Sequence, residues 1–142
     1  MRSKTNAAKI DPLKRLLGDL FSQVELVEAD LLNEQSIREA FTGSTFVAHT
    51  ASPFIQGYKG PEDDILKPAI EGTKTVMKIC AELGVKRVVV TSSIASMNAV
   101  DPAKRPAGDK FDETIWSDPG RPGGLAPYTR SKTLAEMAAW EC

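Results

Sequence analysis

The sequence has little of what several common kinds of protein require. It contains one histidine and two cysteines. His49 is therefore the only residue that could serve a histidine triad or a histidine zinc site. Cys80 and Cys142 have neither the spacing of metal ligands nor the density of a disulfide framework, which predicts no metal site and a reducing, cytosolic compartment. No apolar run approaches the roughly 20 residues that a membrane helix needs, and the start lacks the apolar stretch of a signal peptide.

The chain also lacks an excess of charge of either sign. Its 18 basic and 19 acidic residues leave a formal net charge of -1, and the basic residues are scattered along its length. A nucleic-acid or anionic-lipid surface would need clustered cations, so neither partner is indicated. With 42% hydrophobic and 26% charged residues, the 142-residue chain has the composition of an ordinary globular domain.

Hydrophobic periodicity predicts helices alternating with strands. Helices are expected at 11–20, 33–41, 61–83 and 128–141, and strands at 24–30, 45–51 and 85–93. Pro12 suits a first helical turn, Asn33 is a fair N-cap, and Gly84 marks a helix end. The unbroken valines of the last strand predict burial on both faces. Residues 98–127 hold most of the glycine and proline and predict a long loop.

This alternation predicts an α/β fold with a doubly wound parallel sheet. In such sheets ligands bind beyond the carboxyl ends of the strands. Asp30, the turn at Ala51 and Ser93 each follow a predicted strand at that end. We therefore expect these residues along one edge of the sheet.

Tyr128 and Lys132 are the pair that carries chemistry. Four residues apart on a predicted helix, they lie one turn apart on the same face. A nearby cation favours the phenolate, so the tyrosine could give a proton to a carbonyl oxygen as hydride reaches the carbon, or take it back in reverse. Ser93 could hold the same oxygen through its hydroxyl. Alone, such a pair more often marks a solvated helix face; its position after the strand end at Ser93 favours the catalytic interpretation.

Five motifs in order make the resemblance specific. They are Glu28-Ala29-Asp30-Leu31, His49-Thr50-Ala51-Ser52-Pro53, Lys67-Pro68-Ala69-Ile70-Glu71-Gly72-Thr73, Arg87-Val88-Val89-Val90-Thr91-Ser92-Ser93 and Tyr128-Thr129-Arg130-Ser131-Lys132. Over nearly its whole length the chain resembles the extended short-chain dehydrogenases, in the branch of dihydroflavonol reductases, cinnamoyl-CoA reductases and aldehyde reductases, within the epimerase/dehydratase superfamily. The resemblance implies a Rossmann-like domain that binds NADP and a small carbonyl or alcohol substrate, with residues 1–142 as part of that domain.

The resemblance also implies roles by position. Tyr128 matches the acid, Lys132 the residue that tunes it and holds the nicotinamide ribose, and Ser93, rather than Ser92, the carbonyl anchor. Asp30 and Leu31 match the residues that flank the adenine. Thr50 and Ala51 match residues that line the dinucleotide near its centre, and Arg2 and Lys9 resemble the cations that bind the 2'-phosphate. Asn98 matches a substrate-recognising asparagine.

Several of these residues have a second interpretation. Asp30 could cap the helix that follows it, and Arg2 and Lys9 could be solvated charges. Asn98 could be a turn residue, and His49 is better explained as a strand histidine packed in the sheet than as a catalytic group.

Two segments of an intact member have no counterpart in the sequence. There is no Gly-x-x-Gly-x-x-Gly turn after a first strand, and the chain ends within the helix that bears Tyr128, before a substrate region. We expect a fragment, a truncated reading of the gene or a degenerate copy, inactive by itself. In the strand order 3-2-1-4-5-6, strand 24–30 would be third and strand 45–51 fourth, so both would lack a neighbour. Poor folding and weak NADP(H) binding are then expected.

Three functions remain open at this stage. The first is an NADP-dependent carbonyl reductase, favoured by His49–Pro53 and by the pair Arg2 and Lys9. The second is a nucleotide-sugar epimerase or dehydratase, which uses the same tyrosine and lysine with NAD. The third is a non-catalytic relic or binding protein of the same fold. The substrate and the oligomeric state are not determined by the sequence.

Overall fold

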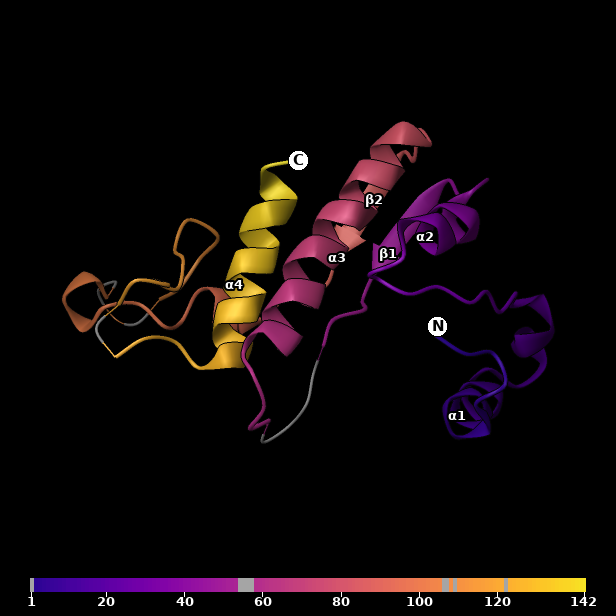
Figure 1. The fold of residues 1–142 in the computed structure, drawn as a ribbon, viewed down its shortest axis with the longest axis horizontal. Helices are drawn as coiled ribbons and strands as arrows, with labels where there is room; N and C mark the ends of the chain where they lie inside the picture. The colour runs from indigo at the N-terminus through magenta and orange to yellow at the C-terminus, as the bar shows by residue number, and fades with distance from the viewer. Residues whose placement is uncertain (1, 54–57, 106–107, 109, 122) are drawn as a thin grey trace.

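A computed structural model describes residues 2–53, 58–105, 108, 110–121 and 123–142. From α2 onward, helices and strands alternate along the chain, as Figure 1 shows. The α-helices of the described residues are α1 (Ala7–Leu17), α2 (Glu34–Phe41), α3 (Asp63–Glu82) and α4 (Pro127–Trp140), and the strands are β1 (Phe46–His49) and β2 (Arg87–Val90). Short 3-10 helices include η1 (Gly18–Gln23), η2 (Ile94–Ser96) and η3 (Pro102–Lys104).

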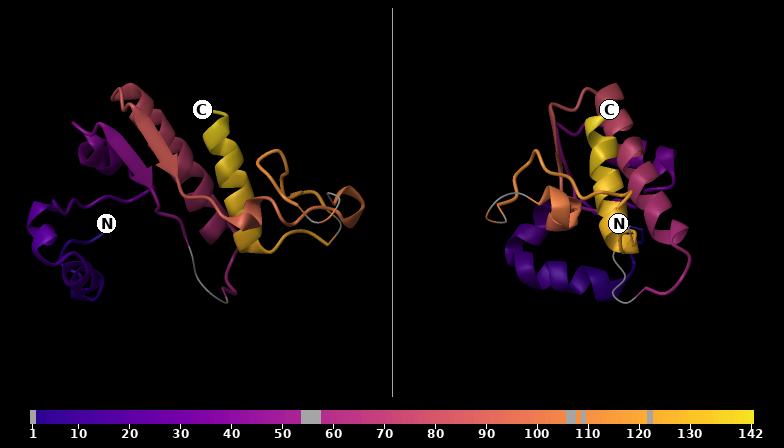
Figure 2. Two further views of the ribbon diagram at one scale, coloured as in Figure 1. Left: turned by 180° about the vertical axis from the view of Figure 1, so that it is seen from behind. Right: turned by 90° about the vertical axis from the view of Figure 1, so that its left-hand side faces the viewer.

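The two strands are parallel neighbours, joined by the crossover helix α3. Phe46 pairs with Arg87, and the register continues to His49 with Val90. Val47 and His49 are buried, whereas Phe46 is 68% exposed, because alternate side chains of a strand point to opposite faces. Helices α2 and α3 cover one face of the sheet, and α3 and α4 lie side by side in all views (Figure 2). This is a partial Rossmann-like α/β fold with a parallel sheet, as the sequence predicts.

The core lies between the covered face of the sheet and helices α2 and α3. Its buried members are Ile37, Val47, Val76, Ile79 and Cys80. Ala29 and Leu31 pack against this cluster from the segment before α2. Gly72 of α3 allows this approach, since a Cβ atom there would lie 2.9 Å from the Cβ of Leu31.

Local signals for helix ends are confirmed at two positions. The Asn33 side chain accepts a hydrogen bond from the Ser36 amide and caps α2. After α3, Gly84 adopts a φ of 69°. The amide of Val85 donates to the Cys80 carbonyl at 2.9 Å and that of Gly84 to Ala81 at 3.2 Å, which is the Schellman pattern of a helix end.

Three expectations about the elements are wrong. Residues 24–30 form no strand, since they pair with no neighbouring strand and backbone hydrogen bonds between strands are what hold a strand in place. Helix α1 begins at Ala7 rather than at 11, so Pro12 lies inside it. Val89 is 60% exposed instead of buried, because among the described residues no helix covers that face of β2.

The remaining segments lie to either side of this layer. Helices α1 and η1 are set apart from the sheet, and the long loop between η2 and α4 extends on the far side of α4 (Figures 1 and 2). The predicted loop 98–127 contains the short helix η3, Gly108 also has 3-10 geometry, and Pro127 already begins α4, while 106, 107, 109 and 122 lie outside the described residues. In the described part of the chain, no helix is long and apolar enough to cross a membrane.

Candidate active site

Tyr128 and Lys132 lie one turn apart at the start of α4. Pro127 occupies the first helical position, where its missing N–H costs no hydrogen bond. The Lys132 ammonium lies 6.0 Å from the centroid of the Tyr128 ring. Lys132 is only 9% exposed, and within the described residues it forms no ion pair. The two side chains thus lie close together on α4, as the helix period predicts.

A small cavity joins this helix to the carboxyl edge of the sheet. Its volume is about 20 Å³, room for roughly one water molecule. The lining residues come from the ends of β1 and β2 and from α3 and α4: His49, Ala51, Ser52, Thr73, Val90, Thr91, Ser92, Lys132, Ala135 and Glu136. Of the residues expected along this edge, Ala51 lines the cavity and Ser92, the neighbour of Ser93, lines it too, whereas Asp30 and Ser93 do not.

His49 is a packed residue of the sheet. It is 7% exposed, and its Nε2 atom lies 3.4 Å from the hydroxyl of Thr73, which donates to the Ala69 carbonyl at 2.8 Å. Burial lowers the pKa of His49 below its ordinary value, and the positive charge of Lys132 lowers it further. The ring is thus held neutral beside the lysine.

Ser93 is oriented by the turn that follows β2. Its side-chain oxygen accepts a hydrogen bond from the Ala95 amide at 3.2 Å and caps η2. Since a hydroxyl has one proton and two lone pairs, the Ser93 proton stays available to a substrate oxygen. Ser93 and Tyr128 are half-buried and do not line the small cavity, which is lined by Lys132 and Ser92 instead.

Asn98 is exposed. Its backbone amide donates to the Ile94 carbonyl, as in a turn.

Glu136 is a residue of this site that sequence reasoning missed. It accepts a hydrogen bond from Ser92, which itself lies 3.1 Å from the hydroxyl of Ser96. Its position four residues after Lys132 places it on the same helix face, and this spacing is the signal that could have found it.

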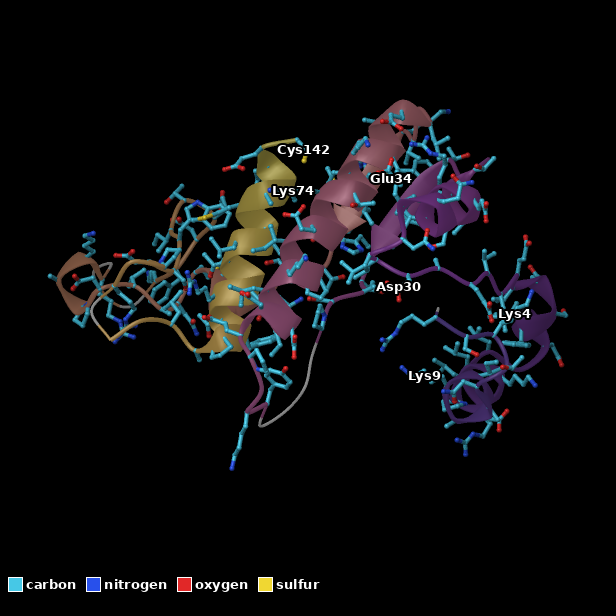
Figure 3. All side chains as sticks on the ribbon, viewed as in Figure 1. Lys4, Lys9, Asp30, Glu34, Lys74 and Cys142 are labelled. Carbon is cyan, nitrogen blue, oxygen red and sulfur yellow. The ribbon has the colours of Figure 1, made fainter. Side chains whose placement is uncertain are left out.

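The residues expected to bind the adenine end lie farther from α4. The Asp30 carboxylate accepts from the Leu32 amide at 2.9 Å and stabilises the turn before α2, while Leu31 packs against the core. Arg2, Lys9 and Thr50 are exposed. Figure 3 shows Lys9 on the separate N-terminal helix and Asp30 on the chain that returns to the sheet. The structure thus brings Lys132 and Ala51 to one cavity and does not pair the two N-terminal cations with Asp30.

The side chains at this site have the donors that one end of a nicotinamide dinucleotide would need, although the cavity of about 20 Å³ is no larger than a water molecule. The buried Lys132 ammonium can bind ribose hydroxyls, and the Tyr128 ring stands beside it. For the pyrophosphate, the described residues offer no glycine turn that opens a helix at the sheet edge. The residues present therefore fit the ribose and nicotinamide end.

The parallel sheet with its crossover helix, followed by a helix that bears the tyrosine and lysine, defines a partial Rossmann-like domain. The profile of the 3-beta hydroxysteroid dehydrogenase/isomerase family matches residues 10–141. The chain belongs to this family, in the branch of dihydroflavonol, cinnamoyl-CoA and aldehyde reductases that the motifs indicate.

Two curated relatives illustrate this branch. The chain is 44% identical over 120 residues to cinnamoyl-CoA reductase 1 of Petunia hybrida, covering 84% of the chain and 34% of that protein. It is 37% identical over 148 residues to dihydroflavonol 4-reductase of Hordeum vulgare, covering 99% of the chain and 40% of that protein. The chain therefore spans less than half the length of these relatives.

Solved structures give the same result. Vestitone reductase of Medicago sativa has a TM-score of 0.73 at 29% identity, covering 99% of the chain and 42% of the structure. The yeast methylglyoxal/isovaleraldehyde reductase, solved with NADPH, has a TM-score of 0.70 at 31% identity, covering 99% of the chain and 43% of the structure. The fold expected from the sequence is thus found in known reductases.

Proposed function

We propose that residues 1–142 are part of an NAD(P)-binding domain of an NADP-dependent carbonyl reductase and carry its proton-transfer residues. The observation that supports this most directly is the position of Lys132, a residue only 9% exposed, whose ammonium lies 6.0 Å from the centroid of the Tyr128 ring at the carboxyl edge of a parallel sheet. Among the described residues this ammonium forms no ion pair, and a cation so enclosed is stabilised by the polar groups of a ligand. The ribose hydroxyls of a cofactor and the tyrosine oxygen are groups that would do so.

Each side chain then has a defined role. The Ser93 hydroxyl donates to the carbonyl oxygen of the substrate and orients it. Tyr128 gives its phenolic proton to the same oxygen, and Lys132 stabilises the phenolate that results. NADPH, when bound, supplies the hydride. The substrate is an aldehyde or a ketone, the class of group that the reductases resembling this chain act on by name.

The choice of NADP over NAD is part of this proposal. The 2'-phosphate of NADP is an anion, and Arg2 and Lys9 are exposed cations. Between them in the sequence, the Lys4 amide donates to the Glu28 carboxylate, two residues before Asp30. An arginine pairs with phosphate through two parallel hydrogen bonds. The yeast reductase that resembles this chain was solved with NADPH, which favours the same cofactor.

The test is NADPH oxidation with an aromatic aldehyde, beside a nucleotide-sugar epimerisation assay, in a polypeptide that extends this chain to the length of its relatives. Lys132→Met should lower reduction by at least about 100-fold, because the phenolate loses its cation. Lys74→Met is the matched control: Lys74 is exposed on α3 and pairs with Glu71 at 3.5 Å. Epimerisation without reduction, or equal loss in both variants, would contradict the proposal.

A further inference from the structure

We propose that Glu136 is a positioning residue that holds Ser93 in register with the tyrosine helix, through Ser92 and Ser96. This inference rests on the proposed reductase function. It concerns a series of side-chain contacts that begins on the third turn of α4, where Glu136 accepts from Ser92, and ends at the Ser93 carbonyl, which accepts from Ser96.

The first link joins the end of β2 to α4. The Ser92 hydroxyl donates to Glu136 Oε2, although these residues are 44 positions apart in the sequence. Glu136 stands two turns after Tyr128 and one after Lys132 on the same helix. A rigid connection between Ser92 and Glu136 therefore relates the neighbouring Ser93 to the helix that presents the phenol.

The next links run through η2. Ser96, which is 2% exposed, has its hydroxyl 3.1 Å from that of Ser92 and 2.6 Å from the Ser93 carbonyl, to which it donates. The Ser96 amide donates to the same carbonyl at 2.9 Å. The Ser93 backbone is thus held by one buried serine that contacts the partner of Glu136.

The opposite side of η2 is fixed by the long loop. Ser117 is fully buried, and its amide donates to the Ser96 carbonyl at 2.7 Å. Its hydroxyl donates to the Ala95 carbonyl at 2.7 Å and accepts from the Ala99 amide at 2.8 Å. With the loop holding one side, the contact between Ser92 and Glu136 sets the orientation of the turn against α4.

The number of hydroxyl protons explains why an acceptor is needed at position 136. Each serine has one proton to donate. Ser96 donates its proton to the Ser93 carbonyl, so Ser92 donates to Glu136. With both protons used in this way, the 3.1 Å approach of the Ser92 and Ser96 hydroxyls is a packing contact. Without an acceptor at position 136, the Ser92 proton turns to the Ser96 oxygen and the link to α4 is lost. A glutamine still offers a carbonyl oxygen, whereas a leucine offers none.

The experiment uses Glu136→Leu and Glu136→Gln in the extended polypeptide of the functional test, with Glu113→Leu as the matched control. Glu113 is exposed and lines, with Glu136, a separate cavity of about 320 Å³, but within the described residues it forms no side-chain hydrogen bond. Amide hydrogen exchange of residues 95–99 is measured first. We expect it to rise about 10-fold in Glu136→Leu and to stay at the original rate in Glu136→Gln and Glu113→Leu.

Kinetics of NADPH-dependent carbonyl reduction form the second readout. Glu136→Leu should lower kcat by about 10- to 100-fold and leave KM close to its original value, because a misplaced Ser93 affects the reacting oxygen. Recovery in Glu136→Gln distinguishes positioning from an effect of the negative charge on Lys132. Equal loss in the glutamine and leucine variants would overturn the proposal.

A second variant covers the case in which Glu136→Leu does not fold, which faster exchange at Ile79 and Cys80 would reveal. Ser92→Ala removes the donor without changing α4 and should give the same local increase at residues 95–99. Unchanged exchange in Ser92→Ala would refute the inference. If the unaltered protein reduces no carbonyl while exchange responds as expected, the proposed function fails and the hydrogen-bond chain stands.

Discussion

Leu31 packs directly against the backbone of Gly72, so closely that a Cβ atom on the glycine would lie 2.9 Å from the Cβ of Leu31. This contact joins the segment after Asp30 to the crossover helix α3. A glycine inside a helix is ordinarily less favourable than alanine by about 1 kcal/mol. Here the close approach of Leu31 reverses that preference.

Gly72→Ala should therefore destabilise the protein by about 1 to 3 kcal/mol, the usual cost of overpacking a core. The measurement is urea unfolding followed by tryptophan fluorescence. Gly84→Ala is a useful comparison, since Gly84 has a φ of 69° and nothing near its Cβ position, so its cost of about 1 kcal/mol is backbone strain alone. A stabilised Gly72→Ala variant would show that Leu31 moves away freely.

The phenol of Tyr128 can be tested with the second tyrosine of the chain as control. Tyr128→Phe keeps the ring and removes the proton, so carbonyl reduction should fall by at least about 100-fold in an extended, active polypeptide. Tyr58→Phe removes a hydroxyl that bonds to the exposed Asp64 and should leave the rate within about twofold. Most activity surviving in Tyr128→Phe would remove this residue from the mechanism.

Cofactor choice is tested at Arg2. Arg2→Gln should weaken NADPH binding by about 10-fold or more and leave NADH binding nearly unchanged, because only NADPH has the 2'-phosphate. Arg15→Gln, an exposed cation near the end of α1, is the control. Fluorescence titration with both cofactors gives the comparison. An equal loss for NADPH and NADH would end the assignment of Arg2 to the phosphate.

His49 should make stability depend on pH. Its folded pKa is lowered, first by burial and then by Lys132, so the unfolded chain binds a proton more readily. The contribution of His49 to the free energy of unfolding is then fully present above the pKa of the unfolded state, about 6.5. It is lost as the pH falls from there toward the lower pKa of the folded state, with a slope of at most about 1.4 kcal/mol per pH unit. Urea unfolding between pH 7 and 5 should show this slope, and His49→Gln should remove it. An identical slope in both proteins would assign it to other groups.

Much of the local structure could be predicted from the sequence. Asn33 and Gly84 terminate their helices through contacts within a few residues, so composition and order suffice to place them. The spacing of Tyr128 and Lys132 likewise needs only the helix period. The roles of these two residues and of Ser93 stay predictions, as does the cytosolic location expected from the cysteines.

Contacts between distant segments were decided by the tertiary structure. Residues 24–30 have the alternation of a strand but form none, because a strand requires hydrogen bonds from a neighbour and not only the right side chains. Val89 is exposed for a similar reason, since burial depends on what packs above it.

Ser92 and Ser93 have the same side chain in adjacent positions, and the sequence by itself determined only that two hydroxyls follow β2. Folding brings Glu136, 44 residues later, within hydrogen-bond reach of Ser92. Ser93 instead caps η2 through its oxygen and keeps its proton available. The sequence determines which groups exist and how they repeat along a helix. Only the packing of α4 against the end of β2 determines that the Ser92 hydroxyl is bound by Glu136 while the Ser93 hydroxyl can contact a ligand.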